Sequence, residues 1–290
     1  MSGGVYRSGE GRLAVEGLYR RVLGRWPVAK EELQVETRFG STFVVACGKE
    51  GAPPVMLLHG SQASSAAWLP DVARWSAQFR LFAVDMIGEP GFSAPSRPPL
   101  EGDGHALWLD EVLKGLGLGS APVALVGASL GGWLALDYAS RRPGAVRALA
   151  LICPAGIGRQ KNFLLKALPL LLLGSWGRRR IRELVFGKAP ARLPPEIQPL
   201  AELMETIGRS VEPRVVRIPR LSDAELGALG MPILAIVGGR DVLLDSRETR
   251  ERLRRAAPHA EICFLEQGRH FLPDQTVRIA DFLNRALRQP

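Results

Sequence analysis

Cysteine is scarce in this chain of 290 residues, and metal-binding patterns are absent. The three cysteines, Cys47, Cys153 and Cys263, share no close spacing, and each lies in an apolar run typical of a strand. We therefore expect buried thiols in a reducing compartment rather than a disulfide framework. No His, Cys or carboxylate cluster has the spacing of a metal site, and no glycine-rich phosphate loop is present. The sequence predicts neither a metal nor a cofactor.

Long apolar runs are also missing. The longest, residues 164–173, is interrupted by Lys166 and Pro169 and is too short to span a bilayer. Residues 1–26 contain no uninterrupted apolar stretch followed by a small-residue cleavage site, so no secretory signal is expected. These two absences predict a cytoplasmic protein without a transmembrane segment.

Acidic residues are outnumbered by basic ones, 29 against 38, and the formal net charge is +9. Nearly all of the excess lies in residues 157–222, which hold thirteen Lys or Arg and five Asp or Glu. No nucleic-acid-binding module accompanies this charge, so we expect no nucleic-acid partner. A solvated arginine-rich surface, an anionic substrate and an acidic membrane surface all stay open as explanations.

Short apolar runs alternate with helix-like segments along most of the chain. Such an alternation predicts an α/β fold with a mostly parallel, doubly wound sheet covered on both faces. Its active site is then expected outside the carboxyl ends of the strands. The expected strands are residues 33–37, 42–47, 54–58, 80–84, 123–126, 146–152, 233–237 and 261–265. The expected helices are residues 68–78, 104–115, 130–141, 246–256 and 274–288.

Two segments fall outside this alternation. Residues 11–24 have apolar positions at helical spacing, which predicts an N-terminal helical extension over residues 1–32. Residues 158–222 contain several prolines and helix-like pieces but no convincing strand. We expect this segment to form a helical cap between two late strands, above a core of residues 33–157 and 223–290. The helix-like pieces of the cap are residues 163–173, 178–186 and 197–207.

The strongest chemical signal is the pentapeptide Gly127-Ala128-Ser129-Leu130-Gly131. A buried strand is expected immediately before it and a helix immediately after it, which is the context of a nucleophile elbow. The glycines allow strand and helix to approach closely, while the serine takes a strained backbone and projects into the cleft. Ser129 is therefore the predicted nucleophile.

A serine hydroxyl needs an adjacent base, and only four histidines are available. His270 follows the expected strand 261–265 in a loop that can reach over the sheet edge, whereas His105 and His259 are expected to be structural or exposed. Asp241 follows the strand 233–237 and is the predicted carboxylate that orients the base. Asp245 is its nearest rival, but its position favours an N-cap of the next helix.

The oxyanion of an acyl-transfer reaction needs hydrogen-bond donors. Leu130 supplies one backbone N–H directly after the nucleophile. The second donor is expected in the loop His59-Gly60-Ser61-Gln62, with Ser61 preferred and Gln62 next. His59 itself is expected to shape this loop.

Three segments carry a resemblance to a known family: the loop that begins at His59, the pentapeptide around Ser129, and the pair Asp241 and His270. In this order and at these spacings they resemble the α/β-hydrolase superfamily, specifically its capped group of serine esterases, lactonases and carbon–carbon-bond hydrolases. The likeness covers residues 35–290 and extends to the turn Asp85-Met86-Ile87-Gly88-Glu89-Pro90-Gly91-Phe92-Ser93, where one extra residue separates the glycines. We carry over only the structural role of this turn, with Glu89 at the cleft mouth as a hypothesis. Epoxide hydrolases and haloalkane dehalogenases need a carboxylate where this chain has Ser129.

The resemblance implies a serine hydrolase that cleaves a small or medium-sized ester through an acyl-enzyme. An apolar or anionic acyl substrate is the expected partner, and the oligomeric state is open. An acyltransferase, a cofactor-free perhydrolase and a carbon–carbon-bond hydrolase are alternatives on the same triad, because the fold does not determine the acceptor. A weakly catalytic or non-catalytic small-molecule-binding protein is a further alternative. The leucines of residues 164–173 are expected either to roof an acyl pocket or to pack the cap onto the sheet.

Overall fold

The computed structural model describes residues 4–187, 194–195, 197–214 and 216–288. The strands in these ranges are β1 (Lys30–Thr37), β2 (Gly40–Cys47), β3 (Pro54–Leu58), β4 (Arg80–Val84), β5 (Val123–Ala128), β6 (Val146–Ile152), β7 (Ile233–Gly238) and β8 (Glu261–Leu265). The helices are α1 (Gly9–Leu23), a 3-10 turn η1 (Ser65–Trp68), α2 (Leu69–Trp75), α3 (Gly104–Gly115), α4 (Leu130–Arg141), α5 (Phe163–Leu171), α6 (Gly174–Phe186), α7 (Gln198–Ser210), α8 (Asp223–Gly227), α9 (Ser246–Ala256) and α10 (Thr276–Arg288).

The strands form a single sheet in the order β1-β2-β4-β3-β5-β6-β7-β8. Strands β3 to β8 are parallel, whereas β2 pairs antiparallel with both β1 and β4. The predicted mostly parallel α/β sheet is therefore confirmed. Strand β1 begins at Lys30 rather than at residue 33, because an edge strand tolerates the charged side chains of Lys30 and Glu31.

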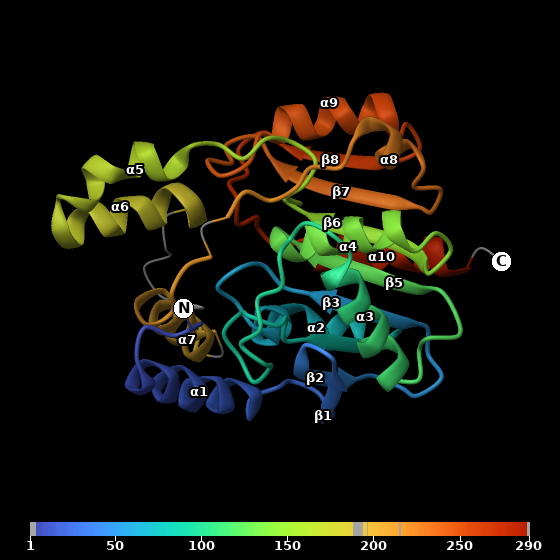
Figure 1. Ribbon diagram of the computed structural model, residues 1–290, viewed down its shortest axis with the longest axis horizontal. Helices are drawn as coiled ribbons and strands as arrows, with labels where there is room; N and C mark the ends of the chain where they lie inside the picture. Colours follow the sequence, from blue (N-terminus) through green and yellow to red (C-terminus); the bar gives the residue numbers. More distant parts are fainter. Residues whose placement is uncertain (1–3, 188–193, 196, 215, 289–290) are drawn as a thin grey trace.

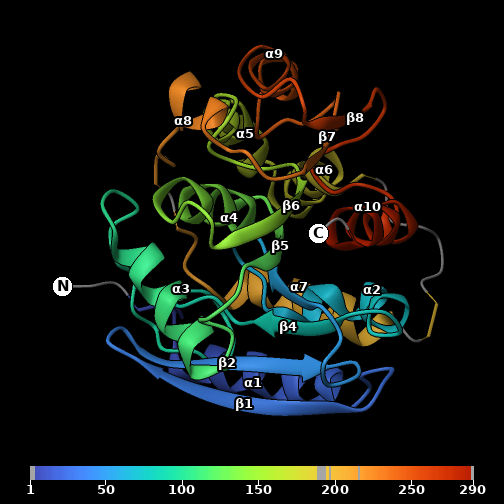
Figure 2. The same ribbon diagram turned by 90° about the vertical axis from the view of Figure 1, so that its right-hand side faces the viewer.

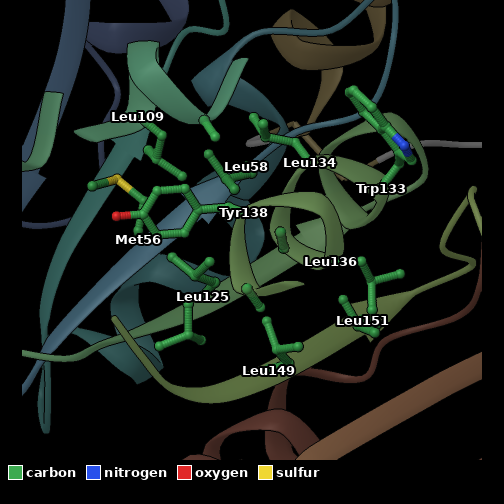
Figure 3. Close-up of a cluster of buried hydrophobic side chains, with 14 of the residues drawn as sticks. Met56, Leu58, Leu109, Leu125, Trp133, Leu134, Leu136, Tyr138, Leu149 and Leu151 are labelled. Atoms are coloured by element: carbon green, nitrogen blue, oxygen red, sulfur yellow. The ribbon is translucent and has the colours of Figure 1, made fainter. Parts of the chain in front are cut away.

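Helices cover both faces of the sheet. Figure 2 shows α3 and α4 on one side of the strands and α2 and α10 on the other. The central strands are buried on both faces, so they read as continuous apolar runs in the sequence. Figure 3 shows the core on the α4 face, where Leu134 and Tyr138 of the helix lie near Met56, Leu58 and Leu125 of the strands. Each large apolar side chain buried there contributes about 1.5–3 kcal/mol to stability.

Helices α5, α6 and α7 lie in the chain between β6 and β7, where the cap was expected. Helix α7 packs against α1, and the two helices lie side by side in Figure 1. The Arg7 N–H donates to the Ser210 carbonyl at 2.9 Å, and the Glu212 N–H donates to the Val5 carbonyl at 2.9 Å. The N-terminal segment and the cap segment therefore hold each other, while the division of the chain at residues 32, 157 and 222 stays a prediction.

Two of the three cysteines are buried, as expected from the sequence. Cys47 and Cys153 are buried and Cys263 is partly buried, and all three are unpaired. Among the described helices, none combines the length and the apolar character needed to cross a bilayer.

Candidate active site

Ser129 lies at the turn between β5 and α4. Its backbone has φ 51° and ψ −109°, in the region where side chains other than glycine are strained. The turn is tight because α4 begins immediately against the neighbouring strand: a Cβ on Gly131 would lie 2.1 Å from the Leu58 carbonyl oxygen. Only glycine permits this approach. The strain and the close packing together project the Ser129 side chain from the carboxyl end of β5.

Ser129, His270 and Asp241 meet in a continuous chain of hydrogen bonds. The Ser129 hydroxyl lies 3.0 Å from Nε2 of His270, and Nδ1 of His270 lies 2.7 Å from Oδ2 of Asp241. Because a carboxylate only accepts, Nδ1 carries the proton and Nε2 is the free acceptor for the hydroxyl. This is the tautomer that a general base requires.

Asp241 is held in place by the chain that follows β7. Its Oδ1 accepts the N–H groups of Leu243 at 2.7 Å and Leu244 at 3.0 Å, and the carboxylate is shielded from solvent. Asp245 instead accepts the Glu248 N–H at 3.1 Å and caps α9. The structure thus brings Asp241, and not its rival, to the histidine.

The rings of the other three histidines have partners other than Ser129. His59 is fully buried, and burial lowers its pKa to about 4, so it is neutral. Its Nε2 accepts the Met86 N–H at 3.0 Å and its Nδ1 donates to the Gly60 carbonyl at 2.8 Å. His105 is buried edge-on against Trp133, while His259 is exposed and contacts the Met231 carbonyl. His59 therefore links the loop after β3 to the turn after β4, as a structural histidine should.

The loop after β3 lies directly beside the nucleophile. A Cβ on Gly60 would lie 3.4 Å from the Ser129 Cβ. The Gln62 N–H is already used, because it donates to Oε2 of Glu89 at 2.7 Å. Of the two loop donors considered from the sequence, Ser61 therefore stays the predicted one, because the Gln62 N–H already has an acceptor. Leu130 is the first residue of α4, where backbone N–H groups have no helical partner.

Residues 55–282 match the Alpha/beta hydrolase family. The chain belongs to this family. The carboxylesterase YbfK of Bacillus subtilis is 30% identical to this hydrolase over 262 residues, 88% of this chain and 86% of the relative. The crystal structure of that carboxylesterase (CesB) superimposes with a TM-score of 0.80 at 28% identity, covering 97% of this chain and 99% of the other. The structure of the naproxen esterase from Bacillus subtilis superimposes with a TM-score of 0.81 at 25% identity, covering 97% and 100%.

A buried carboxylate, that of Glu89, holds the loop of residues 59–62, which we call the oxyanion loop after its predicted role. Glu89 is only 3% exposed, so the hypothesis that it stands at the cleft mouth is wrong. Besides the Gln62 N–H, its Oε2 accepts the Ser61 hydroxyl at 3.3 Å, while Oε1 has no hydrogen-bond partner among the described residues. Burial raises the pKa of Glu89, and the Gln62 N–H and the positive charges of Arg97 and Arg214 oppose that rise. The sequence hinted at this role only through the extra residue between Gly88 and Gly91 in the turn of residues 85–93.

Removing the Glu89 carboxylate is expected to loosen the oxyanion loop. Gln62 has a positive φ of 56° and relies on Glu89 as its acceptor. In Glu89→Ala the half-buried Gln62 N–H loses that partner, and kcat toward an ester falls about 10- to 100-fold with little change in KM, because oxyanion contacts act in the transition state. Steady-state kinetics on purified variants measure this.

Glu89→Gln is the matched control, since its amide oxygen still accepts the Gln62 N–H. We expect it to recover most of the lost kcat. Equal losses in kcat for the two variants, or an unchanged kcat in Glu89→Ala, would contradict the role assigned to this side chain.

Cys153 lies beside Asp241, the carboxylate that accepts from His270. It follows β6 with a φ of 42°, and its thiol contacts Asp241. Burial, and then the negative charge of Asp241, raise the thiol pKa to about 12, so the sulfur is protonated and does not compete with Ser129 as a nucleophile.

The fold also creates a group with metal-ligand spacing that is invisible in the sequence. Ligand atoms of Cys153, Asp241 and His270 lie within 4.8 Å of one another in the described part of the chain. The Asp241 and His270 atoms already bond to each other, and the His270 ring bonds to Ser129. We therefore interpret the group as the surroundings of the triad and keep the expectation that no metal is needed.

Proposed function

We propose that this protein is a carboxylic ester hydrolase that works through an acyl-enzyme on Ser129, with His270 as general base and Asp241 as its orienting carboxylate. The observation that carries the proposal is the unbroken hydrogen-bond chain from Asp241 to Ser129 at the carboxyl ends of the strands. Two Bacillus subtilis relatives named as carboxylesterases, each 30% identical over 88% of this chain, support the ester as the substrate class.

Acylation begins with attack of the Ser129 oxygen on the ester carbonyl. The hydroxyl proton moves to Nε2 of His270, and the resulting imidazolium is stabilised by the Asp241 carboxylate at 2.7 Å. The oxyanion is stabilised by the backbone N–H groups of Leu130 and Ser61, and the N-terminus of α4 adds a favourable dipole. His270 then returns the proton to the leaving alkoxide, which departs as an alcohol.

Deacylation repeats these steps with water as the nucleophile. His270 removes a proton from water, the hydroxide attacks the Ser129 ester, and the serine oxygen leaves with the proton that His270 gives back. The product is the free carboxylic acid. Nε2 of His270 accepts and returns every proton in both halves of the reaction, so the mechanism needs no second general base.

A panel of esters tests this proposal. We expect turnover of p-nitrophenyl and alkyl esters of short to medium acyl chains, and covalent labelling by a fluorophosphonate probe. Added alcohol, peroxide or a carbon–carbon substrate separates hydrolysis from acyl transfer, perhydrolysis and carbon–carbon cleavage. An enzyme that neither turns over any ester nor reacts with the probe would instead be a binding protein.

The proposed substrate is a small-molecule ester, and no nucleic-acid partner is proposed. The three unpaired cysteines fit a reducing compartment, so a cytoplasmic location stays our prediction. Substitutions of Ser129, Asp241 and His270 test the triad one residue at a time, whereas the Glu89 variants test the loop that holds Ser61.

A further inference from the structure

Helices α5 and α6 form a hairpin, residues 163–186, that stands apart from the sheet. The two helices pack against each other. Figure 1 shows the pair projecting at one end of the molecule, beyond the ends of the strands. We call this unit the α5–α6 hairpin.

The α5–α6 hairpin exposes large apolar side chains. Five of the nine exposed large hydrophobic side chains among the described residues belong to it, and Leu172 and Trp176 are 85% and 60% exposed. Phe271 is also exposed and touches Phe186 at a ring-centroid distance of 5.9 Å, which extends the surface beyond the hairpin. A surface this apolar is unusual on a protein that faces only water, and it marks an interaction site. The five side chains are those of Leu168, Leu172, Leu173, Trp176 and Phe186.

The exposure of three leucines argues against both roles considered for residues 164–173, while the side chains of Leu164, Leu165 and Leu171 lie outside the described part of the structure. Leu168, Leu172 and Leu173 are each more than half exposed. They therefore neither roof a closed acyl pocket nor pack the cap onto the sheet.

Positive charge accompanies the apolar surface. Residues 163–186 hold five Lys or Arg and one Asp or Glu, a net charge of +4 out of +9 for the whole chain. The Arg179 and Arg182 side chains are more than half exposed although they pair with Glu183 and Glu205, so both remain accessible from solvent. Leucine and tryptophan beside clustered arginine match an anionic lipid surface, where apolar groups enter the acyl boundary and cations meet the headgroups.

The same hairpin is bonded to both neighbours of His270. The Arg269 guanidinium donates to the Leu184 carbonyl at 3.0 Å, and the Phe271 N–H donates to the Val185 carbonyl at 3.4 Å. The last turn of α6 therefore lies beside the loop that carries the proposed base. Any surface that binds the hairpin is therefore brought next to His270.

We propose that the α5–α6 hairpin docks this enzyme onto the surface of an anionic lipid bilayer, so that esters dissolved in the lipid reach Ser129. The hairpin lies on the surface and does not span the membrane, since α5 has only nine residues and α6 thirteen. Docking stands on the exposed residues alone, whereas the delivery of lipid-borne esters rests on the proposed function.

Co-sedimentation with vesicles tests docking without reference to activity. We expect the full chain to pellet with phosphatidylcholine vesicles that contain phosphatidylglycerol, and to pellet roughly tenfold less with pure phosphatidylcholine or at high salt. The variant Leu172→Asp/Trp176→Asp is expected to lose roughly tenfold or more of its binding. The matched control is Leu13→Asp, because Leu13 on α1 is 71% exposed but lies outside the hairpin. It should bind like the unaltered protein.

Rates on two substrates then test delivery. All three proteins should hydrolyse a short water-soluble ester equally, which shows that the variants fold. The double variant alone should lose roughly tenfold on a long-chain ester embedded in the anionic vesicles. If no ester is cleaved at all, the proposed function fails while the sedimentation result still decides docking.

Three outcomes would overturn the docking proposal. The first is absence of binding to anionic vesicles, and the second is equal loss of binding in Leu13→Asp and the double variant. The third is a dimer in analytical ultracentrifugation that the double variant dissociates, combined with no vesicle binding, because the hairpin would then be an interface between two copies of the chain.

Discussion

Ser129→Ala is expected to lose all labelling by a fluorophosphonate and roughly 10⁴- to 10⁶-fold in kcat, the range found when a nucleophile of this type is removed. The physical reason is that Cys153, the thiol that contacts Asp241, is protonated because burial raises its pKa to about 12, so it cannot replace the Ser129 hydroxyl. Gel fluorescence of the labelled protein and single-turnover kinetics measure the two losses.

The same position offers a test of backbone strain. Ser129→Ala keeps a Cβ at φ 51°, whereas Ser129→Gly removes it. We expect Ser129→Gly to unfold at a higher temperature than Ser129→Ala, by a stability difference of about 1 kcal/mol. Persistent labelling in either variant would show that another residue is the nucleophile.

Asp241→Asn is expected to lower kcat by roughly 10³- to 10⁴-fold while leaving the fold intact. The carboxylate accepts from Nδ1 of His270 at 2.7 Å, and an amide can place an N–H there instead, which favours the wrong tautomer and leaves the imidazolium without a counter-charge. His270→Ala should cost at least as much. Initial rates together with circular dichroism separate the loss of catalysis from unfolding.

Asp245→Asn is the control for the acid assignment. Asp245 caps α9 by accepting the Glu248 N–H, and asparagine caps helices about as well as aspartate, so kcat should stay within a few-fold of the original. If Asp245→Asn were the inactive variant and Asp241→Asn the active one, the proposed triad would be wrong.

Several elements could be predicted residue by residue because their patterns are local. The apolar runs of β3, β4, β6 and β8 end at Gly, Pro or polar residues, and their observed bounds equal the predicted ones. Helix α6 was harder to place: it begins at Gly174 rather than at residue 178. Gly174 and Gly177 lack helical propensity, and packing against α5 overrides this local preference.

Parts of the site could not be predicted because they depend on contacts between distant segments. The turn suggested that Glu89 faces the cleft mouth, yet this side chain is buried and accepts the N–H of Gln62, which lies on the loop after β3. Cys153 reads as a core thiol, and only the neighbouring positions of β6 and β7 bring it to Asp241. The exposure of Leu172 follows from how α5 packs on α6, which an apolar run does not reveal.

The sequence alone determined the catalytic order Ser129, Asp241, His270 and the positions of most strands. The signals are local: glycines surround the serine, a strand ends shortly before the acid and another before the base, and buried parallel strands are continuous apolar runs. The tertiary structure alone decided which buried carboxylate holds the loop after β3 and where the basic apolar hairpin faces. Those outcomes depend on contacts between residues that are 27 positions apart for Gln62 and Glu89 and 85 positions apart for Leu184 and Arg269, and no local pattern in the sequence reports such contacts.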